Sequence, residues 1–187
     1  VLILLSLITA VTSAFLDNVT IVILIAPVTL FVATTLQVNP IPFLIAEILA
    51  SNIGGMATLV GDPPNIMIGS AAGIDFLTFI ANMGPAALII LAAFIGLAYL
   101  MFKGELQKGR ANMEDIDALD ASALITKPTL MTKGLIIMGL VIVGFLVHGI
   151  FHLEPASIAL LGATLLLIWG KIHPHDTLRD VEWTTLL

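Results

Sequence analysis

The feature that most constrains this chain is its first 102 residues, which contain no lysine or arginine and consist largely of apolar runs. A helix needs about 20 apolar residues to cross roughly 30 Å of hydrocarbon. Of the 187 residues, 59% are hydrophobic and 11% charged, and the mean hydropathy is +1.12. Soluble globular domains typically carry about 25% charged residues. We therefore predict an all-α polytopic membrane protein with the lipid bilayer as its surroundings.

The composition also excludes several other classes of protein. The formal net charge is −6 and no basic patch is visible, which argues against a nucleic-acid partner. The high apolar content excludes a disordered chain. The chain contains no cysteine, so it has neither disulfide bonds nor thiolate metal sites.

The basic residues predict an orientation in the membrane. All seven fall in two polar segments, 103–133 and 171–183. Between these segments lie two apolar runs, Gly134–Phe151 and Ala156–Gly170, which fit two spanning helices. Two crossings bring both basic segments to one side, and the positive-inside rule makes that side cytoplasmic. We expect an integral membrane protein with both segments in the cytoplasm.

Two polar interruptions break the apolar pattern before a further expected span at 84–102. The first is Asp17-Asn18, between the apolar runs 1–16 and 19–36, and the second is the segment 52–65, with tandem glycines and tandem prolines. Non-helical backbone at membrane depth survives only where it is buried in protein or lines a wet cavity. Paired interruptions of this composition indicate the midplane site of a transporter.

Each interruption leaves a second interpretation open. Asp17-Asn18 fits the tip of a re-entrant hairpin, because a 16-residue arm is short for a crossing at about 1.5 Å per residue. It fits a surface turn between two ordinary spans equally well. Segment 52–65 fits the unwound middle of one broken helix, flanked by helical runs at 43–50 and 66–79. The less favoured alternative is a surface loop between two short buried helices.

Three acids stand out because the first 102 residues offer them no basic partner: Asp17, Glu47 and Asp62. An ionised carboxylate at mid-bilayer costs about 2.5–3.5 kcal/mol on insertion scales. Each acid must therefore be protonated, cation-bound, hydrogen-bonded or close to water. We expect Glu47 to lie in water near the cytoplasmic end, and Asp62 to cap a helix that starts at Pro63. Helix N-termini attract anions, and unwound carbonyls with Asn and Thr oxygens suit Na⁺.

At the two interruptions the chain resembles the ion transporter superfamily. This group includes the melanosomal P protein and its bacterial relatives, arsenite permeases, NhaD-type sodium/proton antiporters and sodium-coupled dicarboxylate symporters, with a citrate transporter-like domain. The resemblance is carried by Ser-Ala-Phe-Leu-Asp-Asn-Val-Thr at 13–20 and Ser-Asn-Ile-Gly-Gly-Met-Ala-Thr-Leu-Val-Gly-Asp-Pro-Pro-Asn at 51–65. It implies an inverted-repeat transporter with a re-entrant hairpin and a broken helix in each half. It also implies a homodimer in the full-length form and, from the bacterial members, a prokaryotic plasma membrane.

The resemblance also implies an organisation for the chain. Residues 1–102 would end a first transporter repeat, 103–133 would form a cytoplasmic linker, and 134–187 would start a second repeat. Because no repeat is visible within the chain, and both of its ends lie in apolar sequence, we expect an interior piece of a longer transporter.

The family's site residues carry over to the two interruptions. In the symporters, the hairpin tip and the Gly-Gly…Pro-Pro-Asn loop build one cation site. The corresponding residues here are Asp17, Asn18, Thr20, Asn52, Gly54, Gly55, Thr58, Gly61, Asp62 and Asn65. Na⁺ is expected at Asn18, Asn52 and Gly54. The acids Asp17 and Asp62 depart from the symporter pattern, and they favour H⁺- or Na⁺-coupled antiport of a small inorganic ion or anion over dicarboxylate uptake.

Other functions compete with this prediction. An intramembrane aspartyl protease needs Tyr-Asp and Gly-x-Gly-Asp signatures, whereas here Leu16 precedes Asp17 and Leu59 stands where the first Gly should be. Nucleotide binding fails because no lysine follows the glycines. A passive channel and a sodium-coupled dicarboxylate symporter stay open as alternatives. We expect an alternating-access transporter rather than an enzyme, with H⁺ or Na⁺ as coupling ion and no cofactor.

Overall fold

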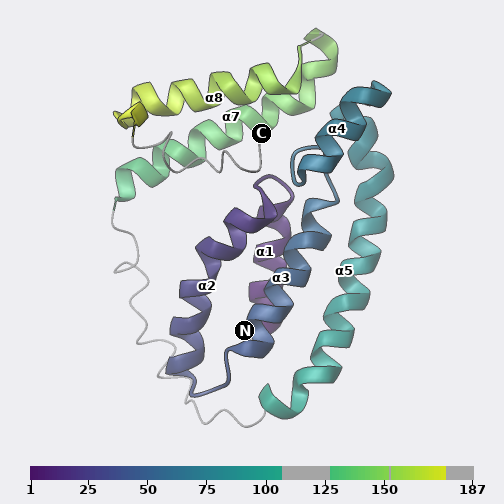
Figure 1. Cartoon of the computed structure of the whole chain (residues 1–187), viewed down its shortest axis with the longest axis vertical. Helices are drawn as coiled ribbons and strands as arrows, with labels where there is room; N and C mark the ends of the chain where they lie inside the picture. The colour runs from purple at the N-terminus through teal and green to yellow at the C-terminus, as the bar shows by residue number, and fades with distance from the viewer. Residues whose placement is uncertain (107–126, 152, 176–187) are drawn as a thin grey trace. The chain divides into compact units, whose positions relative to one another are not determined.

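The computed structural model describes residues 1–106, 127–151 and 153–175, and these residues form helices and connecting turns without strands (Figure 1). The chain separates into two compact units, 1–120 and 121–187. The helices of the first unit are α1 (Leu2–Ser13), α2 (Asn18–Thr35), α3 (Ile41–Gly55), α4 (Pro63–Ala72) and α5 (Phe76–Leu106). The second unit contains α7 (Pro128–Phe151) and α8 (Pro155–Gly170). The predicted linker 103–133 and the C-terminal residues 176–187 lie largely outside the described residues.

Among the described residues, three helices are long and apolar enough to cross a membrane, namely α2, α5 and α7. The helices α1, α3 and α8 are also apolar but shorter. The structure therefore confirms the all-α class and is consistent with a polytopic membrane protein.

Small residues allow α1 and α3 to pack closely in the first unit (Figure 1). Gly54 of α3 lies against the backbone of Ala10 in α1, and a Cβ atom at Gly54 would overlap the Ala10 carbonyl group. Ala10 also shares a buried cluster with Ala50 and with Leu91 of α5. Small residues at a helix interface permit close van der Waals contact, which drives helix association in membranes.

The helical break is shorter than predicted. The sequence pattern placed it at 52–65, but α3 continues through Gly55 and α4 starts at Pro63, so that only residues 56–62 are non-helical. Packing explains the difference, because Gly54 fits against α1 in a helical conformation and tertiary contact overrides the low helix propensity of glycine.

The boundary between α4 and α5 also differs from the prediction of a helix to residue 79 and a span from residue 84. Helix α4 ends at Ala72 and is followed by Gly73, whose φ of 63° places it in the left-handed region that favours glycine at a helix end. Asp75 then caps α5, because its carboxylate accepts from the backbone N–H of Thr78 at 2.9 Å and from its hydroxyl at 2.7 Å. Helix α5 consequently runs on past Pro85 as one element of 31 residues.

The second unit is a hairpin of α7 and α8 with an apolar seam. Gly144 faces the side chain of Ile158, and Gly162 faces the side chain of Val141. The two predicted spans are confirmed as helices, although α7 starts at Pro128 rather than at 134. Proline suits the first turn of a helix, since its missing N–H has no helical partner there.

Candidate functional site

The turn between α1 and α2 forms the first part of the candidate site. Asp17 is the N-cap of α2, and its Oδ2 accepts from the backbone N–H of Thr20 at 3.0 Å and from its hydroxyl at 3.1 Å. These bonds fix the start of α2 in the way that an Asp at the N-cap does in other helices. They also place Asn18 as the first helical residue, with its side chain available for contacts outside α2.

Asn18 joins this turn to both sides of the helical break. Its Nδ2 donates to Oδ1 of Asn52, near the end of α3, and to Oδ1 of Asp62, at the start of α4, each at 3.0 Å. We call these three residues the amide bridge. Because a side-chain amide has two N–H donors, both donors of Asn18 are used. The predicted convergence of the two interruptions is therefore seen at these three positions.

Two buried serines hold the backbone of Asn18, the central residue of the amide bridge. The Oγ of Ser51 donates to the backbone carbonyl of Asn18 at 2.9 Å and lies 3.1 Å from the Oγ of Ser13. A hydroxyl has one proton, so Ser13 is the donor within the serine pair. The sequence pattern did not assign these serines to the site, although each is the first residue of one of the two motifs.

Thr58 fixes the non-helical segment against the hairpin turn. Its hydroxyl donates to the carbonyl of Ala14 and accepts from the backbone N–H groups of Val60 at 3.2 Å and Gly61 at 3.1 Å. An apolar solvent leaves backbone polar groups no partner, so they must be satisfied within the protein. Thr58 meets this requirement for three backbone groups at once.

Asn65 ties α4 back to the end of α3. Its Nδ2 donates to the carbonyls of Gly55 at 3.2 Å and Thr58 at 2.9 Å. Gly55 and Gly61 approach so closely here that a Cβ atom on Gly61 would collide with the backbone of Gly55 and of Ser13. Glycine is therefore required at Gly61 for the close approach of the backbone segments, and a Cβ atom at Gly55 would make a tight contact with the Gly61 carbonyl.

Asp62 differs from its predicted role. It occupies the N-cap position of α4 as expected, but its side chain makes no capping hydrogen bond and instead accepts from Asn18. A hydrogen bond from a residue 44 positions earlier has replaced the local cap. The carboxyl group is therefore directed at the amide bridge, and it is half-buried together with Asn18, whereas Asn52 is exposed.

The remaining predicted site residues lie around the amide bridge rather than in it. Asp17 and Thr20 bond to each other at the hairpin tip. Gly54 packs against α1, and its carbonyl accepts from the N–H of Ala57 at 3.0 Å. The oxygens of the amide bridge are of the hard type that Na⁺ prefers, and the predicted Na⁺ site at Asn18, Asn52 and Gly54 stays a prediction.

The expectation that Glu47 lies in water is wrong. Its side chain is 0% exposed, and its Oε1 accepts from the hydroxyl of Thr29 in α2. Both residues lie in the interior of the first unit, where α2 packs against α3. The sequence offered no local signal for this pairing, because the two residues are 18 positions apart on different helices.

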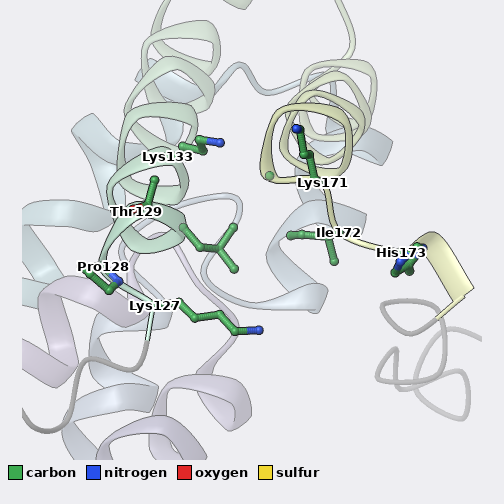
Figure 2. A pocket seen from close by; sticks show the side chains of 9 residues that line it. Lys127, Pro128, Thr129, Lys133, Lys171, Ile172 and His173 are labelled. Carbon is green, nitrogen blue, oxygen red and sulfur yellow. The ribbon is translucent and has the colours of Figure 1, made fainter.

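The second unit contains a basic pocket at the open end of the α7–α8 hairpin (Figure 2). Its volume is about 490 Å³, and Lys127, Lys133 and Lys171 are among its lining residues. Lys133 donates to the backbone carbonyl of Trp169 at 2.8 Å, and its Nζ lies 5.8 Å from the centroid of the Trp169 ring. The fold thus brings together three lysines that do not form a basic patch in the sequence.

Comparison with known proteins gives related transporters. A sequence model of a family described as "Citrate transporter" matches residues 1–187. An uncharacterized transporter of Mycobacterium tuberculosis is 46% identical over 187 residues, which is 100% of this chain and 44% of that protein. A 46 kDa membrane protein of Mycobacterium leprae is 43% identical over 187 residues, again 100% of this chain and 44% of that protein. The P protein of Sus scrofa is 32% identical over 258 residues, 100% of this chain and 30% of that protein. The chain therefore spans less than half the length of these curated relatives.

Proposed function

The chain belongs to the citrate transporter family, and from this premise we propose that it forms part of an ion-coupled secondary transporter. The protein moves a small inorganic ion or anion across the membrane by alternating access, driven by exchange of H⁺ or Na⁺. The observation that carries this proposal is the amide bridge, in which Asn18 donates to Asn52 and to Asp62 at 3.0 Å each. It unites an interrupted hairpin with an interrupted helix, as a transporter's midplane site requires.

The amide bridge supplies a physical link between ion binding and movement. An H⁺ or Na⁺ on the Asp62 carboxylate weakens that group as an acceptor for Asn18. The hydrogen bond from Asn18 holds the α1–α2 turn against the break, so its loss favours a different position of the hairpin. An ion that binds the two positions with different affinity shifts the equilibrium between them. Exchange of the ion at Asp62 therefore drives the change of access.

A second candidate function is sodium-coupled uptake of citrate or a dicarboxylate, which the family description favours. The carboxyl groups of Asp17 and Asp62 oppose this function, because like charges at one site repel. A carboxylate cargo would need Na⁺ between itself and these acids. The two functions therefore differ in whether Na⁺ enters together with the cargo or leaves in exchange for it.

Flux measurements on the full-length protein in proteoliposomes test the proposal. Na⁺, arsenite, citrate and succinate are offered in turn under an imposed pH gradient and an imposed Na⁺ gradient. We expect Asp62→Asn to abolish pH-dependent transport while the protein still inserts and purifies normally. Asp75→Asn is the matched control, because Asp75 caps α5 by bonding to Thr78 and takes no part in the amide bridge. Normal pH-dependent counterflow in the Asp62→Asn protein would count against the proposal.

We also propose that segments 103–133 and 171–183 face the cytoplasm. The absence of cysteine from the chain makes this orientation simple to test with single cysteines placed next to Lys103 and Lys171. Both should react with a membrane-impermeant thiol reagent in inside-out vesicles and resist it in intact cells. Labelling of the two positions from opposite sides would contradict the orientation.

A further inference from the structure

Glu47 is a carboxyl group without a compensating charge in the core of the first unit. Its side chain is 0% exposed, and any chain beyond these residues can only bury it further. Oε1 accepts from the hydroxyl of Thr29, whereas Oε2 has no hydrogen-bond partner among the described residues. An ionised carboxylate that is buried with unfilled acceptor sites is far more costly than a neutral carboxylic acid.

The described side chains of the helices packed against α3 bring no charge to Glu47. Within α1 and α2, every residue is uncharged and none titrates near neutral pH. On α5, the described titratable side chains are Tyr99 and Lys103, and both are exposed. The amide bridge lies further along α3, because Asn52 follows Glu47 by five residues, or about 7.5 Å of helix. Asp62 in the amide bridge and Asp17 beside it lie near the C-terminal end of α3.

Thr29 is directed at Glu47 in a way that other threonines of α2 are not. The hydroxyls of Thr34 and Thr35 donate to carbonyls of their own helix, to Phe31 in both cases. A threonine in a helix commonly satisfies its hydroxyl in this way. The hydroxyl of Thr29 instead leaves its helix and donates to the carboxyl group on α3.

A second unpartnered polar group lies at the same level of the bundle. The Oγ of Ser6 in α1 is buried and has no partner among the described residues. Leu2 packs with Ala46, and about two turns further along α1 Ala10 packs against Ala50 and Gly54. Ser6 is midway between Leu2 and Ala10, so the register places it opposite the part of α3 that carries Glu47. Buried polar groups are normally satisfied, so two orphans at one level require a reason.

We propose that Glu47 is a proton-binding site of the transporter, separate from the amide bridge. This inference rests on the proposed function and names a second residue, besides Asp62, that binds a coupling proton. The closed bundle holds Glu47 in its neutral form, with Thr29 as hydrogen-bond donor to Oε1. The proton passes to water only when the α1–α2 hairpin moves away from α3 and opens the core. Proton release and the breaking of the amide bridge then accompany the same movement.

The first test is infrared spectroscopy of the purified full-length protein, which does not depend on transport. The wild-type spectrum at neutral pH should contain the carbonyl band of a protonated carboxylic acid, and Glu47→Gln should remove the part of that band that Glu47 contributes. Glu154→Gln is the matched control, because Glu154 is exposed at the start of α8, and it should leave the band unchanged. A wild-type protein without the band, or a Glu47→Gln protein in which the band keeps its wild-type intensity, would overturn the inference.

The second test is transport in proteoliposomes. Glu47→Gln should keep exchange of cargo between the two sides but lose accumulation driven by a pH gradient, and Glu47→Asp should restore part of it. Accumulation by Glu47→Gln at the wild-type level would overturn the inference. If the wild-type protein moves none of the cargoes, the proposed function fails while the infrared result still decides whether Glu47 holds a proton.

Thr29→Val provides the answer if Glu47→Gln fails to fold. This change keeps the volume of the side chain and removes the hydrogen bond that favours the ionised form of Glu47. The carboxylic acid band should therefore persist to higher pH than in the wild-type protein. A band with unchanged pH dependence would contradict the role given to the Thr29–Glu47 pair.

Discussion

The α1–α2 hairpin and the α7–α8 hairpin are both made of apolar helices, yet they differ in what their interiors contain. The α1–α2 turn presents Asn18 and Asp17, and Asn18 bonds across to two other segments of the chain. The α7–α8 seam is formed by glycines facing the aliphatic side chains of Ile158 and Val141. In a bilayer the aliphatic seam is favourable, whereas the polar turn costs free energy unless its groups find partners inside the protein.

The comparison teaches where to look for function in an apolar helical chain. Aliphatic packing and an exposed bond from Lys133 to the Trp169 carbonyl connect α7 and α8, whereas the first unit adds buried hydroxyl and carboxyl groups and a half-buried amide. Examples are Ser13, Ser51 and Thr58 around the break and the Thr29–Glu47 pair between α2 and α3. These polar groups are the reason for placing the proposed transport site in the first unit.

The largest expected effect concerns the backbone contact that holds the first unit together. Gly54→Ala would drive a Cβ atom into the carbonyl of Ala10, which cannot rotate away. Overpacking costs about 1–3 kcal/mol and sometimes more, and we expect this variant to reach or exceed that range. Thermal unfolding of the full-length protein in detergent measures the loss.

Two further glycines calibrate this result. Gly162→Ala overlaps the Val141 side chain, which can change rotamer, and makes an ordinary contact with Ile137, so a smaller loss is expected. Gly96→Ala has open space around it and should be neutral or slightly stabilising. If thermal unfolding gave Gly54→Ala and Gly96→Ala the same stability, α1 and α3 would not approach each other as described. The comparison of the two hairpins would then lose its structural basis.

The next effect concerns the amide bridge. Asn18→Asp removes both N–H donors and places a second carboxyl group beside Asp62. Two lost hydrogen bonds are worth about 2 kcal/mol together, and the repulsion adds to this, so transport should fall at least about tenfold. Asn82→Asp is the control, because the Asn82 amide bonds only within α5, to the carbonyl of Thr78 at 2.7 Å. Wild-type flux in Asn18→Asp would remove the amide bridge from the mechanism.

A smaller effect is expected for the serine pair. Ser51→Ala removes the bond to the Asn18 carbonyl and the contact with Ser13. At about 1 kcal/mol for each bond, the free energy of unfolding should drop by about 1–2 kcal/mol. Thr164→Val removes only a bond within α8, to the carbonyl of Leu160 at 2.8 Å, and should change stability much less. If chemical unfolding gave the two variants the same loss, buried hydroxyls would not distinguish the two hairpins.

Much of the first unit could be predicted from local patterns. Asp17 caps α2 because Asp at a helix start has a local reason to do so, and proline at the start of α4 obeys the same kind of rule. The convergence of Asn18, Asn52 and Asp62 was predicted by resemblance together with the requirement that interruptions in a membrane be buried. These features depend on a few neighbouring residues or on one general constraint.

What could not be predicted depends on contacts between distant residues. The tandem glycines Gly54 and Gly55 indicated unwound backbone, yet both are helical. At Gly54 the backbone of Ala10 lies so close that only a glycine fits. Glu47 was expected in water because the first 102 residues contain no basic partner for it, but its carboxyl group accepts a hydrogen bond from the hydroxyl of Thr29. Asp62 suggested a local cap and instead bonds to Asn18. In each case the tertiary partner outweighs the local preference.

The smallest expected effect belongs to the basic end of the α7–α8 hairpin. Lys133→Met removes a contact between the Lys133 ammonium and the ring of Trp169, 5.8 Å from its centroid, together with a bond to the Trp169 carbonyl. A cation–π contact at an exposed site is worth about 0.5–1 kcal/mol. A double-mutant cycle with Trp169→Leu isolates the ring contribution, because the backbone carbonyl remains. We expect a coupling energy below about 1 kcal/mol, since solvent screens this end of the hairpin. A coupling well above that value would mean that the basic end is dry, and the second unit would then bury a polar interaction of its own, as the first unit does.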